Sequence, residues 1–361
     1  MLKLWMLKII HRAILKELTL AFILSLIFLN FIMMMEKVLK FSRLLSGVGA
    51  SVTDMLAIIL YLQPQLMTIT IPMSLLLSIL LTYGRINADN ELAILKTGGM
   101  SFADICRPVF ALGIFCFVAG LAISFSLGPS SAVKMRDYLS NVLIKRAPMA
   151  VEAGVFNTSF KDIVMLVRDK PAPEEMKGIF IYDDRNKKEP KVLVAKEGRI
   201  HTDREFNLSL YIKDGYIHIA RPDGATEISF KGYNLALNVA RQGLSRRNVE
   251  MTPAELLKEA KKEKKGERVA LLLEFHRRLS LPSLCLLLMF LGPPLSLLSG
   301  KSGRLGGLTI GLGVFTVFYI MLMYGENMVR AGDIPHFAGA WAPVAITGIA
   351  SLWAFRKAGL R

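Results

Sequence analysis

The stretch IILYLQPQLMTITIPMSLLLSILLTY, residues 58–83, decides the fold class. It contains no Asp, Glu, Lys or Arg, and it is longer than the roughly 20 apolar residues that a helix needs to cross a bilayer core. Pro64 and Pro72 interrupt it, but a membrane helix tolerates proline where neighbouring groups satisfy the freed carbonyl. The stretch therefore predicts a membrane span.

Five further stretches have the same apolar character, and a polar middle region separates the six into three and three. They cover residues 18–35, 109–127, 279–298, 305–324 and 341–355. The 361-residue chain is 53% hydrophobic and yet 20% charged, which is possible because apolar and charged residues occupy different segments. This pattern excludes a disordered or collagenous chain, and Cys106, Cys116 and Cys285 lie in or beside apolar runs, which argues against a disulfide scaffold. We expect an α-helical membrane protein divided at 1–127, 128–274 and 275–361.

The distribution of Lys and Arg predicts the orientation of the spans. If the N-terminus is cytoplasmic, the inside segments hold most of the cations, which are Lys3, Lys8, Arg12, Lys16, Arg85, Lys96, Arg107, Lys301, Arg304, Arg356, Lys357 and Arg361. The short outside segments hold Lys37, Lys40, Arg43 and Arg330. The positive-inside rule therefore places both termini in the cytoplasm and the middle region in the periplasm.

The middle region reads as an antiparallel β domain. Short β-type runs at 163–167, 178–182, 191–195 and 206–212 are separated by turn signals, with Asp214-Gly215 and residues 222–224 expected as hairpin turns. This spacing favours a sandwich or a jelly-roll-like domain. Thr252, Pro253 and Glu255 then form an N-cap, an N1 proline and a capping box for a helix over 253–265. Glutamates interleave with the lysines of that helix, so a solvated face is favoured over nucleic-acid binding.

The polar segment 85–101, between the second and third spans, is amphipathic. Ile86, Leu92, Ile94 and Leu95 recur at near-helical spacing, and Gly98-Gly99 forms a stop, so a helix over about 85–99 is expected. Its polar face includes Asp89, Asn90 and Glu91. The helix could rest on the bilayer surface or dock into a cytoplasmic partner, and its acidic centre favours docking because surface helices prefer Lys and Arg.

Charges also follow the first span and close the fifth. Lys37, Lys40 and Arg43 are either the solvated end of a helix or a site for an anionic amphiphile whose phosphates would meet the cations. Glu326 is either a functional charge at the membrane edge or simply exposed at the interface.

Glycines line the start and middle of the fifth span. Small residues four positions apart, such as Gly307 and Gly311, allow two helices to approach closely. The seam that they predict could be fixed or could open laterally.

The chain resembles the LptF/LptG (YjgP/YjgQ) permease family, the transmembrane subunits of an ABC transporter that extracts lipopolysaccharide from the bacterial inner membrane. The residues that carry the resemblance extend along the whole chain. They are IPMSLLL at 71–77, DNELAILKTGGMS at 89–101, EFHRRLSLP at 274–282, GPPLS at 292–296, SGR at 302–304, GDIP at 332–335 and WAP at 341–343. The GPSS sequence at 128–131 is more similar to LptF than to LptG.

The resemblance implies six spans with a periplasmic β-jellyroll between the third and fourth. It implies a heterodimer of LptF and LptG bound to an LptB-type ATPase dimer, with ATP and Mg in that partner and no cofactor in this chain. The segment between spans two and three would be the coupling helix, in which Glu91 matches the family's acidic residue and Arg85, Asp89, Asn90, Leu92 and Leu95 accompany it. Lys37, Lys40 and Arg43, with Glu326, would bind lipopolysaccharide, and the β domain would pass it to LptC and LptA.

Other classes of function are less compatible with the sequence. Metalloprotease, nucleophile-elbow and CxxC motifs do not occur, so we expect a transport subunit and not an enzyme. An ion-coupled transporter would normally place ionisable residues in the middle of its spans. A membrane-anchored scaffold or sensor with an external β domain is the alternative function.

Overall fold

The computed structural model describes residues 2–46, 51–146, 152–160, 162–172, 174–186, 189–202, 208–221, 224–237, 248–298 and 303–359. They form two compact units. One is helical and comprises Met1–Glu36, Tyr61–Val133 and Arg247–Arg361, and the other comprises Lys37–Leu60 and Lys134–Arg246 and contains the β sheet. Each unit is described by itself.

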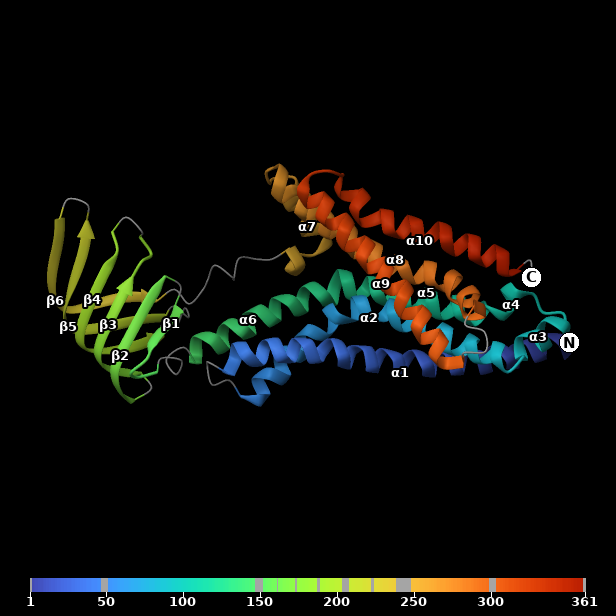
Figure 1. Cartoon of the computed structure of the whole chain (residues 1–361), viewed down its shortest axis with the longest axis horizontal. Helices are drawn as coiled ribbons and strands as arrows, with labels where there is room; N and C mark the ends of the chain where they lie inside the picture. Colours follow the sequence, from blue (N-terminus) through green and yellow to red (C-terminus); the bar gives the residue numbers. More distant parts are fainter. Residues whose placement is uncertain are drawn as a thin grey trace. The chain divides into compact units, whose positions relative to one another are not determined.

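Six helices are long and apolar enough to span a membrane within the described residues, which confirms the predicted number. Their bounds are α1 Leu2–Ser46, α2 Val52–Ala88, α5 Arg107–Ala122, α8 Lys265–Leu298, α9 Gly303–Ala331 and α10 His336–Gly359 (Figure 1). The third span continues through a π-helical turn, η1 (Ile123–Leu127), into α6 (Gly128–Arg146). The helices are longer than predicted because an apolar stretch marks the part that fits hydrocarbon, whereas backbone hydrogen bonding continues past it.

In the helical unit, α8 packs against α5, α9 and α10. Small residues make several of these contacts close. A Cβ atom added to Gly113 of α5 would lie 2.8 Å from Met289 of α8, and one added to Gly311 of α9 would lie 2.9 Å from Leu77 and Leu80 of α2. Gly311 therefore belongs to a tight helix seam, as the glycine pattern predicted.

The β unit contains one antiparallel sheet of six strands. They are β1 Phe156–Phe160, β2 Ile163–Ala172, β3 Glu175–Asp183, β4 Lys191–Thr202, β5 Leu208–Arg221 and β6 Gly224–Leu237. Each strand pairs with the next along the chain, in the order β1-β2-β3-β4-β5-β6. The antiparallel β domain is confirmed, and its described strands form a meander without the crossover of a Greek key.

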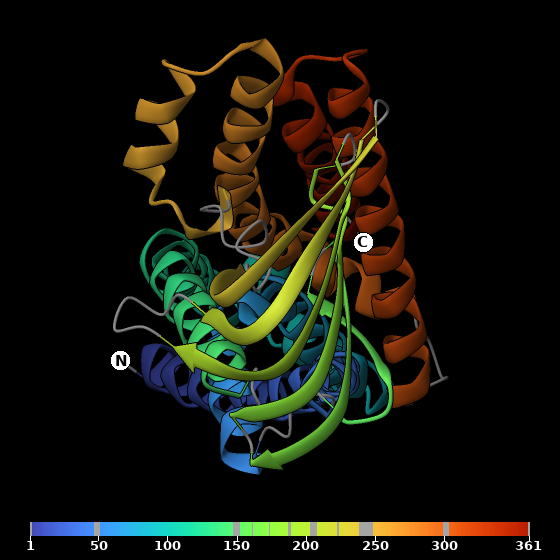
Figure 2. The same cartoon turned by 90° about the vertical axis from the view of Figure 1, so that its left-hand side faces the viewer.

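The sheet buries one face. Met165, Ile181, Leu210 and Ile212 come from three strands and are fully buried in a single apolar cluster. The strands bend strongly (Figure 2), and the Arg185 guanidinium after β3 donates to the carbonyl oxygen of Ala236 in β6. Curvature lets a single sheet enclose its own core.

Asp214 and Gly215 do not form the predicted hairpin turn but lie inside β5. Asp214 has a left-handed φ of 49°, which the Asp-Gly turn signal reflects, yet the pairing of β5 with β4 and β6 continues past it. A Cβ atom on Gly215 would lie 2.4 Å from the Val194 carbonyl oxygen, so close packing inside the sheet explains this glycine. The other turn signal includes residues 222–223, outside the described residues, and Arg221 pairs with Gly224 on either side of it.

The predicted start of the helix after the β strands is confirmed. Thr252 caps α7 (Pro253–Ala260), with Glu255 completing the capping box and proline at the first turn. The helix ends at Ala260, before the expected 265, and α8 begins at Lys265. A short 3-10 turn, η4 (Asn248–Glu250), precedes α7.

Candidate functional site

The segment between the second and third spans contains a separate short helix, α3 (Glu91–Thr97). The helix expected over 85–99 is divided, because α2 runs to Ala88 and Asn90 adopts a left-handed φ of 58° before α3 begins. At the other end, the Gly99 N–H donates to Lys96 and the Met100 N–H donates to Leu95, which is the Schellman pattern that ends a helix. The backbone thus sets α3 apart as a defined unit.

One face of α3 is anchored in the helical unit. Leu92 is buried in an apolar cluster with Tyr83 and Ile86 of α2, and Leu95 packs against the same cluster. The Tyr83 hydroxyl donates a 2.8 Å hydrogen bond to the carbonyl oxygen of Ile105 at the end of α4 (Phe102–Ile105). Ile94 of the same helix lies outside this cluster and is 67% exposed.

Arg85 brings together three carboxylates at this end of the helical unit. Its Nε and Nη2 atoms donate to Glu17 of α1 at 2.6 and 2.7 Å, and its Nη1 atom donates to Asp89 at 3.1 Å and to Glu91 at 2.9 Å. Arg85, Asp89 and Glu91 were assigned from the sequence to one coupling segment, and the structure places Arg85 in contact with both carboxylates. Glu17 was not predicted, although a single acid among the basic residues before the first span was a signal for it.

Lys37, Lys40 and Arg43 all lie in α1, which continues well beyond the predicted first span. Residues three apart on a helix lie on neighbouring parts of its surface. Lys40 is exposed and Lys37 is half-buried, whereas the side chain of Arg43 is outside the described residues.

Glu326 of α9 lies in a cluster of ion pairs and is 12% exposed. Its Oε1 atom is 3.3 Å from Nε of Arg277 in α8, and its Oε2 atom is 3.7 Å from Nη2 of Arg330. Glu326 is therefore neither isolated nor simply exposed, because two cations surround its carboxylate. The sequence motif EFHRR supplied the signal for this cluster, which lies in the part of α8 that precedes the predicted span.

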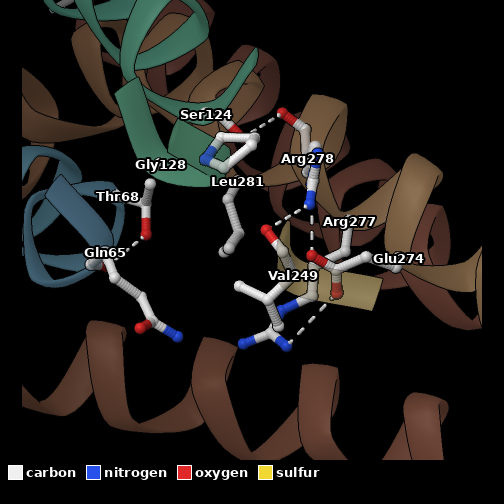
Figure 3. Close-up of a pocket in the computed structure, with 10 residues that line it drawn as sticks. Gln65, Thr68, Ser124, Gly128, Val249, Glu274, Arg277, Arg278 and Leu281 are labelled. Carbon is white, nitrogen blue, oxygen red and sulfur yellow. Dashed lines mark hydrogen bonds and ion pairs between the residues drawn. The ribbon is translucent and has the colours of Figure 1, made fainter. Parts of the chain in front are cut away.

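Arg278 is buried beside this cluster, and all three nitrogens of its guanidinium group donate hydrogen bonds (Figure 3). Its Nε atom donates to Glu274 at 3.2 Å, and its terminal nitrogens donate to the carbonyl oxygens of Asn248, Val249 and Met251. Arg278 thereby ties η4 and the start of α7 to α8. A small pocket of about 70 Å³ lies next to it, lined by polar and apolar residues that include Gln65, Thr68, Gly128, Arg277 and Leu281.

Comparison with known proteins identifies the family to which this chain belongs. The model of the family described as lipopolysaccharide export system permease LptF/LptG matches residues 12–357. The chain belongs to the LptF/LptG family. Lipopolysaccharide export system permease protein LptF of Escherichia coli (strain K12) is 22% identical over 139 residues, which are 38% of each protein. An uncharacterized protein of Rickettsia prowazekii (strain Madrid E) is 24% identical over 153 residues, or 42% of each.

Each curated match spans about two fifths of the relative's own length. What the comparison establishes is therefore membership of the LptF/LptG family, and the structure adds six apolar helices and an inserted antiparallel sheet. The roles of individual residues rest on the geometry above.

Proposed function

We propose that this chain is the membrane-spanning subunit of an ATP-driven transporter that extracts lipopolysaccharide from the inner membrane and passes it to a periplasmic bridge. The observation that carries the proposal is α3. It is a short helix between two spans, anchored by Leu92 and exposed through Glu91 and Ile94, and the exposed Asp89 lies just before it. An exposed helix with one fixed face suits a partner that pushes on the membrane unit.

An external energy source is required by the chemistry of the substrate. Each CH₂ group buried in a bilayer contributes about 0.8 kcal/mol, and a lipopolysaccharide carries many of them, so extraction does not occur spontaneously. The proposed partner is an LptB-type ATPase dimer that binds ATP and Mg and docks on α3. A permease paralogue, LptC and LptA-type bridge proteins complete the assembly, in which this chain is of the LptF type.

The surface of the helices is compatible with a second membrane subunit and a lipid between the two. In the most apolar 18-residue stretch of each helix, 22% of α1 and 17% of α9 are buried within the chain, whereas 78% of α2 is buried. Two of the spans thus leave most of their apolar surface for lipid, for the bilayer or for a paralogue. Both termini would face the cytoplasm and the β sheet the periplasm, as the charge distribution predicts.

Charge reversal at Glu91 tests the docking role of α3. In the purified complex, Glu91→Lys should uncouple ATP hydrolysis from lipid transport while the permease still inserts and folds. Glu267→Lys, a reversal at an exposed position of α8, is the matched control and should transport normally. Normal assembly and transport by the Glu91→Lys complex would refute the docking assignment.

Neutral substitutions of Lys40 and Arg43 test the lipid-binding role. If these cations meet lipid phosphates, Lys40→Gln with Arg43→Gln should weaken binding of phosphorylated lipopolysaccharide more than binding of the dephosphorylated lipid. Equal effects on the two lipids would make these residues a solvated helix end.

Purification from membranes separates the proposal from the scaffold or sensor alternative. A small soluble ATPase and a paralogous permease should accompany the chain and be identified by mass spectrometry. A chain that purifies with neither of them would contradict the proposed function.

A further inference from the structure

The Arg85 guanidinium connects α1 to α3. Glu17 of α1 receives two hydrogen bonds from it, through Nε and Nη2, and Glu91 of α3 receives one through Nη1. The two hydrogen bonds to Glu17 fix the orientation of the guanidinium plane as well as its position, whereas a single hydrogen bond would fix only the position. Arg85 belongs to α2 and also binds Asp89 through Nη1, so Glu17 is the group of α1 that helps hold the guanidinium against Glu91.

Apolar packing joins the same elements beneath the ion pairs. Ile14 and Leu18 of α1 are buried in one cluster with Ile86 of α2 and Leu92 of α3. Nearby, Nε2 of His11 donates a 2.9 Å hydrogen bond to the carbonyl oxygen of Asp104 in α4. Residues 11–18 of α1 therefore pack with both short helices.

The contact between α1 and α3 is nevertheless incomplete. A pocket of about 280 Å³ lies between them, lined by Ile10, Ala13 and Ile14 of α1 and by Ile94 and Leu95 of α3. Glu17, Arg85 and Glu91 line the same pocket. Apolar side chains do not fill this space. The ion pairs of Arg85 therefore contribute more there to holding α3 against α1 than apolar packing does.

We infer that Glu17 is a positioning residue, which through Arg85 holds α3 against α1 so that the two helices move together when α3 is displaced. The inference rests on the proposed function for the force on α3, but the connection itself is a property of this chain. It assigns to Glu17 the task of transmitting movement from α3 to the first membrane span.

A distance measurement tests the connection. Spin labels on Arg12→Cys in α1 and Thr97→Cys in α3 report the separation of the two helices, and the native cysteines Cys106, Cys116 and Cys285 are buried. The distribution should be narrow and should stay unchanged when ATP is added to the complex. Glu17→Gln should broaden it, and Lys16→Gln, a substitution at the exposed neighbour, should not.

Transport per ATP hydrolysed tests the consequence. Loss of a charge-assisted hydrogen bond corresponds to about a tenfold change in an equilibrium, so Glu17→Gln should move about tenfold less lipid per ATP while ATPase activity remains. Glu17→Gln combined with Arg85→Gln should be no worse than the worse single variant, because both remove one connection. Additive losses would show that Glu17 and Arg85 act separately.

The outcomes distinguish this inference from the proposed function. An unchanged distance distribution or unchanged transport per ATP in Glu17→Gln overturns the positioning role, even if Glu91→Lys uncouples as expected. If Glu91→Lys transports normally while Glu17→Gln broadens the distribution and lowers transport per ATP, the docking assignment fails and the connection stands.

Discussion

The Ser124 hydroxyl donates a 3.2 Å hydrogen bond to the carbonyl oxygen of Arg278, and the pair is buried (Figure 3). Pro282 lies four residues after Arg278 in α8 and has no N–H, so this carbonyl lacks its usual helical donor. Ser124 belongs to η1, where the third span departs from α-helical geometry. The irregular turn supplies the donor that the proline removes.

Ser124→Ala should destabilise the helical unit, because it leaves a buried carbonyl oxygen unpaired. The expected loss is about 1–3 kcal/mol of the free energy of unfolding, measured by thermal or denaturant unfolding in detergent. Ser130→Ala is the control, since that hydroxyl binds the Leu127 carbonyl at an exposed position and its removal should change little.

A double-mutant cycle with Pro282→Ala tests the reason. Alanine restores an N–H group opposite the Arg278 carbonyl, so Ser124→Ala should cost less in the Pro282→Ala background than in the native one. Equal costs in both backgrounds would show that Ser124 does not compensate for the proline.

Gly325→Ala should disrupt the packing of α9 on α10. The new Cβ atom would lie 2.7 Å from the Gly339 carbonyl oxygen, and neither backbone can yield easily. We expect a loss of about 1–3 kcal/mol in unfolding free energy. Gly313→Ala in the same helix meets no atom within 4 Å and should be neutral or slightly stabilising. Equal tolerance of both substitutions would contradict the close contact.

Arg278→Gln should release residues 248–251 from α8, because three backbone carbonyls lose a buried cationic donor. Hydrogen exchange followed by mass spectrometry should show amide exchange at least about tenfold faster in this segment, equivalent to 1.4 kcal/mol. Arg330→Gln removes a mostly exposed guanidinium from the neighbouring cluster and serves as the control. Unchanged exchange in Arg278→Gln would mean that other contacts hold η4.

The β sheet should lose stability in acid through Asp183. Burial raises the pKa of this carboxyl group. Hydrogen bonds from Arg185 at 2.6 and 2.8 Å, together with the Arg185 charge, outweigh that effect, so the pKa lies below the ordinary 3.8. Because the pKa of Asp183 is lower in the folded state than in the unfolded state, its carboxylate stabilises the fold at pH values above the unfolded-state pKa. That contribution is lost as the pH falls through the folded-state pKa. Limited proteolysis of the full chain between about pH 5 and 3 measures the effect.

Asp183→Asn should reduce the acid-dependent part of this loss. Asp184→Asn, which removes a carboxylate at the next position, should retain it. A steep acid transition that persists in Asp183→Asn would assign the sensitivity to other groups.

The sequence predicted the parts of this protein that short-range chemistry determines. Apolar stretches gave the six spans, and the capping box at Thr252 gave the start of α7, because each depends on neighbouring residues alone. Asp214-Gly215 was misread because the same dipeptide suits a hairpin turn and a bent strand, and only pairing across the sheet distinguishes them. Glu17 was missed because its partner Arg85 is distant in sequence, and Glu326 was placed without Arg277 for the same reason.

The meander order of the sheet has one more consequence. Among the described strands, β1 and β6 each have a single neighbour, so the outer backbone of β6 carries a row of N–H and C=O groups that its own sheet does not use. Such an edge strand can pair with a strand from another polypeptide. A fragment that contains only the β sheet should therefore tend to polymerise through the edge of β6. A lysine or proline substituted into β6 should reduce this association and keep the fragment in solution.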